Sequence, residues 1–141
     1  MAGIRGKNTK PELRIRRGLH ARGLRFRLHC PDIPGNPDLC FRSRKAVIFI
    51  HGCFWHAHGC HLFKWPQTRA DFWKEKITGN QLRDRTTLAR LHDGGWRVLT
   101  IWECALKGAR KRDLDEVLAT TDSWIREGQG DLEVSWAHEP V

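Results

Sequence analysis

The sequence predicts one α/β domain over residues 1–141, with a mixed β-sheet flanked by helices in the order α-β-β-β-α-β-α. The length of 141 residues suits a single domain with a real core. Apolar residues make up 40% of the chain and charged residues 29%, which is ordinary for a folded protein. Segments with strand-like apolar patterns alternate with segments of helical spacing, and this alternation predicts the order of elements.

The first helix is expected to begin at Thr9 and to end at Gly23. A threonine is a favourable N-cap, and Pro11 suits the first turn because a helix needs no N–H donor there. Glu12 lies three residues after Thr9 and can complete a capping box. Glycine at position 23 is typical of a helix end.

Three short strands are expected to follow the first helix. Leu24–His29 alternates apolar and basic residues, which indicates a half-buried strand. Residues 33–37 have turn composition, and Asp38–Phe41 is a second short strand. The basic turn Arg42–Lys45 then joins it to the apolar run Ala46–Ile50, so that the last two strands form a hairpin.

The second half of the chain is expected to contain two helices and one strand. A polar helix should start at residue 68 or 71 and reach about residue 91, with an interruption near Gly79. Trp96–Trp102 is apolar enough to be a central strand. Residues 112–125 should form a closing helix, and we expect residues 126–141 to be a loose tail.

The chain is strongly basic, with a formal net charge of +9 and a pI near 9.9. Such a charge favours a polyanionic partner such as nucleic acid, although a merely soluble basic surface is the alternative. No apolar run approaches the length of a membrane span, and the N-terminus lacks the apolar core of a signal peptide. We therefore expect a cytoplasmic protein without a membrane partner.

The segment from His51 to Cys60 is rich in residues that bind metals. Cys53, His58 and Cys60 are spaced as chelating ligands, and Cys104 can supply a fourth. Three thiolates and one imidazole would fill a tetrahedral shell around Zn²⁺, so the zinc would be structural. The alternative is that Cys104 is a small buried apolar residue, a common role of a free cysteine.

Three further residues could carry hydrolytic chemistry. His51 and His56 are interleaved with the zinc ligands, and an imidazole can accept a proton from water near neutral pH. Their alternative role is to support the zinc site. Asp38 follows a turn and is a hard anionic ligand suited to Mg²⁺, although an aspartate after Pro37 could simply cap the turn.

Several motifs stand in a fixed order along the chain: Ile4–Glu12, Gly35–Asp38, His51–His56, Thr68–Trp73, Asn80 with Arg83 and Asp84, Gly95–Leu99 and Trp102–Cys104. Together they resemble the very short patch repair (Vsr) DNA mismatch endonucleases, and the resemblance runs from Met1 to about Lys107. It implies a restriction-endonuclease-like fold with a structural zinc site. Family members usually carry a further basic arm upstream of residues 4–8, and this sequence begins at Met1.

The resemblance implies an enzyme that nicks duplex DNA 5′ to the T of a T:G mismatch. Such mismatches arise when 5-methylcytosine is deaminated. The implied cofactors are catalytic Mg²⁺ and structural Zn²⁺, and the implied enzyme is a bacterial monomer that acts on the nucleoid. Two alternatives remain open: a zinc-containing DNA-binding module without activity, and a related nuclease with broader mismatch specificity.

The resemblance also assigns roles to individual residues. Asp38 becomes the essential Mg²⁺ ligand, and His56 and His51 become catalytic, with His56 favoured as the general base. Glu12 would hydrogen-bond a metal-bound water or orient His56. Some relatives have threonine where this chain has Ile50, so that here only the backbone carbonyl of Ile50 could bind Mg²⁺.

The resemblance implies that Phe54, Trp55 and Trp73 are wedges that enter between base steps of the DNA. A mismatched site costs less to distort than a paired one, so wedging produces selectivity. From its sequence position alone, Trp73 could equally be a packing residue. Among the basic residues, Arg25 and Arg69 are candidates to bind phosphates, with a solvated surface as the alternative.

Overall fold

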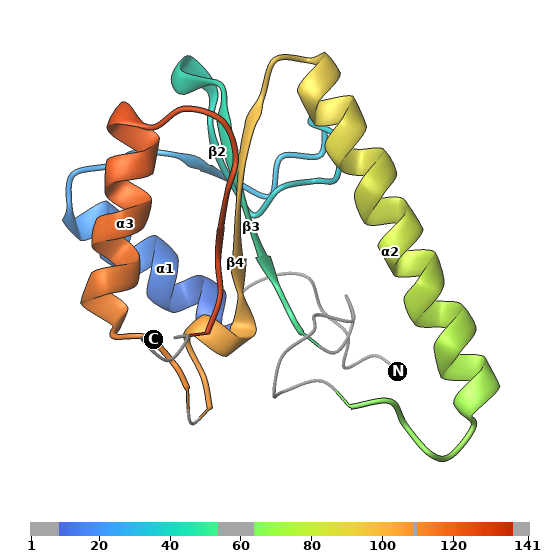
Figure 1. Cartoon of the computed structure of the whole chain (residues 1–141). Coiled ribbons are helices and arrows are strands. Elements are labelled where there is room, and N and C mark those ends of the chain that lie inside the picture. The colour runs from blue at the N-terminus through green and yellow to red at the C-terminus, as the bar shows by residue number, and fades with distance from the viewer. Residues whose placement is uncertain (1–8, 54–63, 109, 137–141) are drawn as a thin grey trace.

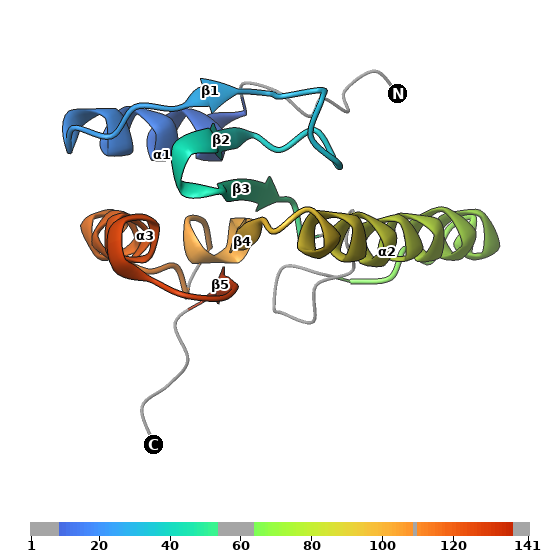
Figure 2. The same ribbon diagram turned by 90° about the horizontal axis from the view of Figure 1, so that it is seen from above.

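A computed structural model of the chain describes residues 9–53, 64–108 and 110–136. Five strands form one sheet in the order β1-β2-β3-β4-β5. In Figures 1 and 2, α1 and α3 cover one face of this sheet and α2 lies on the other. The elements are α1 (Lys10–Ala21), β1 (Arg27–Leu28), β2 (Leu39–Phe41), β3 (Ala46–His51), α2 (Ala70–Asp93), β4 (Arg97–Trp102), α3 (Leu114–Glu127) and β5 (Leu132–Val134), with short 3₁₀ turns at Arg42–Arg44 and Glu103–Ala105.

Helix α1 begins and ends where the sequence predicts. The Oγ1 atom of Thr9 accepts a hydrogen bond from the N–H of Glu12 at 3.3 Å, so Thr9 is the N-cap. At the other end, Gly23 adopts a φ of +91°, which stops the helix without the steric cost that a side chain would add. The capped start fixes Glu12 in the first turn of α1.

The sheet is mixed. Strands β1, β2 and β3 are antiparallel neighbours, whereas β3 pairs with β4 in parallel from Ala46↔Arg97 to His51↔Trp102. The predicted strand over Leu24–His29 is wrong in length, because only Arg27–Leu28 pair with β2. Leu24 is instead buried in the core beside α1. The parallel register brings the ends of β3 and β4 to the same edge of the sheet.

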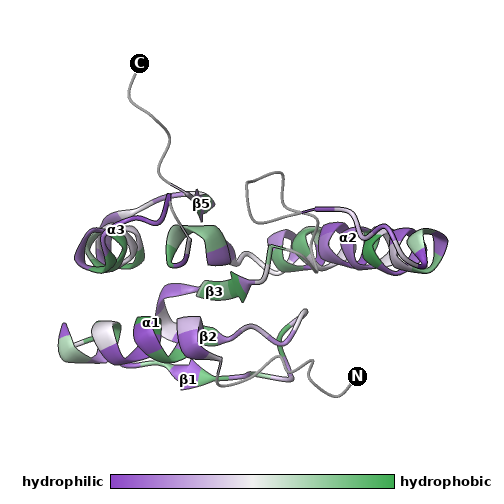
Figure 3. Cartoon of the chain, turned by 90° about the horizontal axis from the view of Figure 1, so that it is seen from below, coloured by the Kyte–Doolittle hydropathy of each residue, from purple (hydrophilic) through white to green (hydrophobic). Residues whose placement is uncertain are grey.

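Two apolar clusters fill the space on the two faces of the sheet. The cluster under α1 and α3 is the larger, and it takes Ile48 and Leu99 from the central strands. The cluster under α2 contains Val47, Phe49 and Val98, whose side chains alternate with the first set along the strands. Figure 3 shows β3 as a hydrophobic stretch between the helical layers. Cys30 and Cys40 are buried in the second cluster.

Helix α2 runs unbroken for 24 residues, so the expected interruption near Gly79 is wrong. A glycine inside a helix costs only about 1 kcal/mol relative to alanine, and the neighbouring turns tolerate that cost. Only Ile77 and Leu91 are buried along the whole helix. Most of α2 is therefore not buried, and its first half extends beyond the sheet (Figure 1).

Residues 126–136 are not the loose tail that we expected, and residues 137–141 lie outside the described residues. Helix α3 continues to Glu127, and β5 then pairs in parallel with β4, from Leu99↔Leu132 to Ile101↔Val134. A three-residue strand carries too little pattern to be recognised in the sequence. Its formation depends on the exposed edge of β4. The closing element of the sheet was therefore missing from the predicted order.

Gly35 fits the turn before β2 closely against α2. Its φ is +82°, and a Cβ at this position would lie 2.4 Å from Cγ2 of Thr87 and 3.0 Å from Cζ of Phe49. Only glycine allows both the left-handed conformation and this close approach. The turn that leads to Asp38 is thereby held between α2 and the sheet. None of the helices in the described part of the chain has the length and apolar character of a membrane span.

Candidate active site

A cleft of about 540 Å³ opens between α2 and the sheet. Its floor is formed by the side chains of β3 and β4 that face α2, and the turn before β2 forms one end. Asp38, His29 and His51 line it, as do Asp84 and Thr87 of α2. The cleft thus gathers acidic and imidazole groups from distant parts of the sequence, as enzyme sites commonly do.

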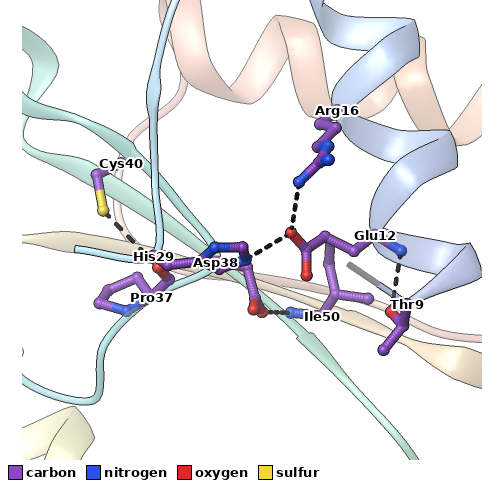
Figure 4. Close-up of polar contacts among 8 residues, drawn as sticks. All are labelled: Thr9, Glu12, Arg16, His29, Pro37, Asp38, Cys40 and Ile50. Carbon is purple, nitrogen blue, oxygen red and sulfur yellow. Dashed lines mark hydrogen bonds and ion pairs between the residues drawn. The ribbon is translucent and has the colours of Figure 1, made fainter. Parts of the chain in front are cut away.

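Asp38 directly precedes β2 and forms a hydrogen bond with the neighbouring strand β3. Its Oδ2 atom accepts a hydrogen bond from the N–H of Ile50 at 2.7 Å (Figure 4). Burial raises the pKa of Asp38 to about 7; the bond from Ile50 opposes this rise, and the charge of Glu12 adds to it. A carboxyl group whose charged form is disfavoured in this way is a typical member of a functional site.

Glu12 reaches the same place from α1. Its side chain is 1% exposed, and its Oε2 atom lies 2.7 Å from Nε2 of His29 and 3.2 Å from a guanidinium nitrogen of Arg16 (Figure 4). A buried carboxylate is costly unless hydrogen bonds and opposite charge compensate it. Glu12 is therefore held at the junction of α1 and the sheet, beside Asp38.

Glu12, His29 and Asp38 form a group whose potential ligand atoms all lie within 4.8 Å of one another. Two carboxylates and an imidazole are donors that bind divalent cations. Our sequence analysis did not identify His29 as a functional residue. The available signal was its position at the end of the alternating segment, just before the turn that leads to Asp38.

His51 ends β3 beside two aromatic rings. Its imidazole centroid lies 5.3 Å from that of Trp102, in an edge-on arrangement, and 5.4 Å from that of Phe49. The Nε1–H of Trp102 donates to Oε1 of Glu133 at 2.9 Å. The imidazole is thus packed in a defined orientation on the cleft floor.

Cys53 and Cys104 come together through the parallel register of β3 and β4. His51 pairs with Trp102, and each cysteine follows its paired residue by two positions. Both cysteines are completely buried, and the N–H of Cys53 donates to the carboxylate of Glu103 at 3.2 Å. The two predicted ligands that the structure describes therefore lie at the same end of adjacent strands.

The fold that carries this site is similar to that of a known nuclease. The chain superposes on the catalytic domain of the homing endonuclease I-Bth0305I with a TM-score of 0.51 over 84% of this chain and 96% of that domain, at 23% identity. This likeness concerns the fold, and it confirms a restriction-endonuclease-like mixed sheet with flanking helices.

Similarity in sequence is closer. The family model for the DNA mismatch endonuclease Vsr matches residues 1–62. The type II nicking enzyme V.XorIIP of Xanthomonas oryzae pv. oryzae is 48% identical over 84% of this chain and 88% of its own length. The chain belongs to the Vsr family. The DNA mismatch endonuclease Vsr of Escherichia coli is 45% identical, covering 89% of this chain and 80% of that protein.

Five residues that our sequence analysis assigned to the site of this Vsr family member fall outside the described residues: Phe54, Trp55, His56, His58 and Cys60. Their roles as wedges, general base and zinc ligands therefore stay predictions. Of the catalytic set, the structure describes Glu12, Asp38, Ile50 and His51, and each of them except Glu12 lines the cleft. Glu12 is linked to the cleft through its contact with His29, which lines it.

None of the predicted DNA-binding residues that the structure describes lines the cleft. Trp73 is half-buried near the start of α2, with its ring 5.1 Å from that of Phe72. Arg69 precedes α2 with its guanidinium 4.2 Å from the centre of the Phe72 ring. Arg25 instead donates to the carbonyls of His20 and Leu24 at the end of α1. The start of α2 thus combines exposed cationic and aromatic surface.

Proposed function

We propose that this protein nicks one strand of duplex DNA 5′ to the T of a T:G mismatch by Mg²⁺-dependent hydrolysis. The observation that carries the proposal is the cleft of a Vsr family member, where the potential ligand atoms of Asp38, Glu12 and His29 lie within 4.8 Å of one another and where Asp38 and His51 both line the cleft. The names of the relatives, a mismatch endonuclease and a nicking enzyme, support the reaction.

The residues at Asp38 fit a hard divalent cation. The Asp38 carboxylate would hold Mg²⁺ together with the backbone carbonyl of Ile50, whose N–H already bonds to Asp38. A strand residue directs its N–H and C=O to the same side of the strand, so the Ile50 carbonyl lies on the side of β3 that faces β2. Bound there, Mg²⁺ would neutralise phosphate charge and lower the pKa of an attacking water.

The imidazoles and Glu12 would handle the proton and the water. His56 would act as general base, and His51 would hydrogen-bond the scissile phosphate or transfer a proton, since both can exchange protons near neutral pH. Glu12 would orient the attacking water or His56 from its fixed place beside Asp38. The aromatic contacts of His51 with Phe49 and Trp102 support this role, because packing against two rings limits the freedom of the imidazole.

We assign a structural zinc to Cys53, His58, Cys60 and Cys104. The burial of Cys53 and Cys104 at the ends of two paired strands supports this assignment. A closed tetrahedral site at this position would join the segment after β3 to the end of β4. It would thereby fix the segment that carries His56 relative to the cleft.

Selection of the mismatch would depend on aromatic wedges and DNA deformation. Phe54, Trp55 and Trp73 would enter the base stack, at a cost of a few kcal/mol per step that is smaller at a T:G pair. Arg25, Arg69 and the net charge of +9 would supply phosphate binding that does not depend on sequence. We expect the enzyme to act as a monomer on DNA in the bacterial cytoplasm.

Cleavage of an oligonucleotide panel with every mismatch in several sequence contexts tests the function. We expect nicking with Mg²⁺ on T:G duplexes, 5′ to the T, and none on paired DNA. Asp38→Ala should remove nicking while DNA affinity stays within about twofold, because no phosphate-binding cation is lost. Asp32→Ala is the matched control, since Asp32 is exposed and pairs with Arg42.

Binding without any nicking by the wild-type protein would instead support a zinc-containing DNA-binding module. Nicking of many mismatches at similar rates would support the broader nuclease. Full activity of Asp38→Ala would refute the proposed catalytic centre.

A further inference from the structure

The carboxylate of Glu12 contacts His29, which lines the cleft. Glu12 is 1% exposed, and a glutamate has three side-chain torsions that must be fixed before its oxygens can orient a water. Arg16 holds it from one turn further along α1 at 3.2 Å. The shorter contact, at 2.7 Å, comes from Nε2 of His29, which directly follows β1.

His29 is itself fixed by the backbone that carries Asp38. The backbone N–H of His29 donates to the backbone carbonyl oxygen of Asp38 at 3.1 Å. The φ of His29 is +49°, which lies in the left-handed region. That conformation is uncommon for residues other than glycine, and histidine is among those that adopt it more often. One residue therefore contacts the backbone of Asp38 and, as Figure 4 shows, the side chain of Glu12.

The 2.7 Å contact between Nε2 of His29 and Oε2 of Glu12 indicates the role of the imidazole. The Glu12 carboxylate also accepts a hydrogen bond from the guanidinium of Arg16, so it acts as an acceptor, and we assign the proton of the 2.7 Å contact to Nε2 of His29. A protonated Nε2 has no lone pair for a cation. The arrangement therefore suits an Nε2–H donor that holds a carboxylate.

We propose that His29 is a positioning residue: its Nε2–H fixes the Glu12 carboxylate beside Asp38, and it acts on DNA nicking through Glu12. This inference rests on the proposed function, because Glu12 must take part in the reaction for its position to matter. It adds a residue that our sequence analysis and the family resemblance did not assign.

Two substitutions separate the hydrogen bond from the imidazole. His29→Leu removes the donor, and His29→Gln keeps an N–H donor at the end of a side chain of similar reach. Losing a supporting partner of a catalytic group typically lowers activity by about 10–100-fold. We expect that loss in the single-turnover nicking rate of His29→Leu, with affinity for T:G duplex within about twofold of wild type. His29→Gln should recover most of the rate.

A double-mutant cycle tests whether His29 acts through Glu12. In a Glu12→Ala background, His29→Leu should cause no further loss of rate, because the group that it positions is gone. His20→Leu is the matched control, since His20 is an exposed histidine on α1 away from the cleft. Thermal unfolding and the binding of Mg²⁺, measured by calorimetry, are recorded for each variant.

Each outcome decides one question. A near-normal rate for His29→Leu, or additive losses in the cycle, would overturn the positioning role. A His29→Gln variant that folds but is as slow as His29→Leu would also overturn it, because the imidazole itself would then be required. If Asp38→Ala retains nicking in the same assay, the proposed centre fails independently of His29.

Discussion

The indole of Trp102 lies edge-on to the imidazole of His51, with 5.3 Å between the ring centroids. The two residues are paired in the register of β3 and β4, although 51 positions separate them in the chain. Glu133 of β5 accepts the indole N–H at 2.9 Å and so fixes the far side of the ring. The orientation of His51 thus depends on three adjacent strands.

Replacing Trp102 with leucine should lower the rate of nicking by about 10–100-fold, since small misplacement of a catalytic group has effects of that size. Glu133→Ala should have a smaller effect, because Glu133 is exposed and the aromatic contact survives. Single-turnover cleavage of a T:G duplex provides the measurement, with Glu127→Ala on the exposed end of α3 as control. A Trp102→Leu enzyme with unchanged rate and fold would show that His51 needs no such support.

Purified protein should contain about one zinc per chain. Cys104→Ser should lose both the metal and stability, because binding of a structural zinc is coupled to folding. Cys40→Ser is a matched control: Cys40 is equally buried, but it lies in the apolar cluster under α2. Elemental analysis measures the zinc content of the two variants, and thermal unfolding measures their stability. Equal zinc contents in the two variants would contradict the assignment of Cys104.

Gly35→Ala should destabilise the protein more than Gly95→Ala. Both glycines have φ near +80°, so each alanine carries the left-handed penalty of roughly 1–2 kcal/mol. A Cβ at Gly35 also collides with Cγ2 of Thr87, whereas nothing lies within 4 Å of a Cβ at Gly95. Overpacking of this kind adds about 1–3 kcal/mol.

Denaturant unfolding compares the two variants, and Thr87→Ser, which lacks the colliding methyl group, should partly rescue Gly35→Ala. Equal free-energy losses for Gly35→Ala and Gly95→Ala would show that the turn before β2 is not tightly packed against α2.

Asp122 should make stability dependent on pH at the contact between α1 and α3. It pairs with Arg22 at 2.8 Å and with Arg126, and the hydrogen bond from Arg22 is the main reason that its pKa lies below the usual 3.8. Because the folded pKa is the lower one, the stabilisation is complete above pH 3.8 and is lost as the pH falls below that value. These ion pairs are partly exposed, so we expect them to stabilise the folded protein by only about 0.5–1 kcal/mol.

Asp122→Asn should therefore be less stable than wild type at pH 7, and the difference should shrink below pH 4. Chemical denaturation at several pH values measures it. A difference that is constant with pH would assign the effect to packing and not to charge.

Local sequence signals predicted the elements whose formation depends mainly on near neighbours. Thr9, Pro11 and Gly23 mark the limits of α1, and the apolar runs mark β3 and β4, because capping, turn chemistry and hydrophobic periodicity act over a few residues. The same signals failed at Gly79, where the helix tolerates one unfavourable residue, and at β5. That strand is short, and it forms only because β4 offers an unpaired edge.

The sequence also determined which residues have the chemistry for a site. Asp38, Glu12, His51 and the cysteines are recognisable as acids, bases and ligands by residue type and by motif. The tertiary structure decided which of them meet. His29 was not identified because its role arises from two contacts, one with Glu12 and one with the backbone of Asp38, and neither is encoded by spacing along the chain. Packing of α1 against the sheet brings those atoms together, and a local pattern carries no information about such distant contacts.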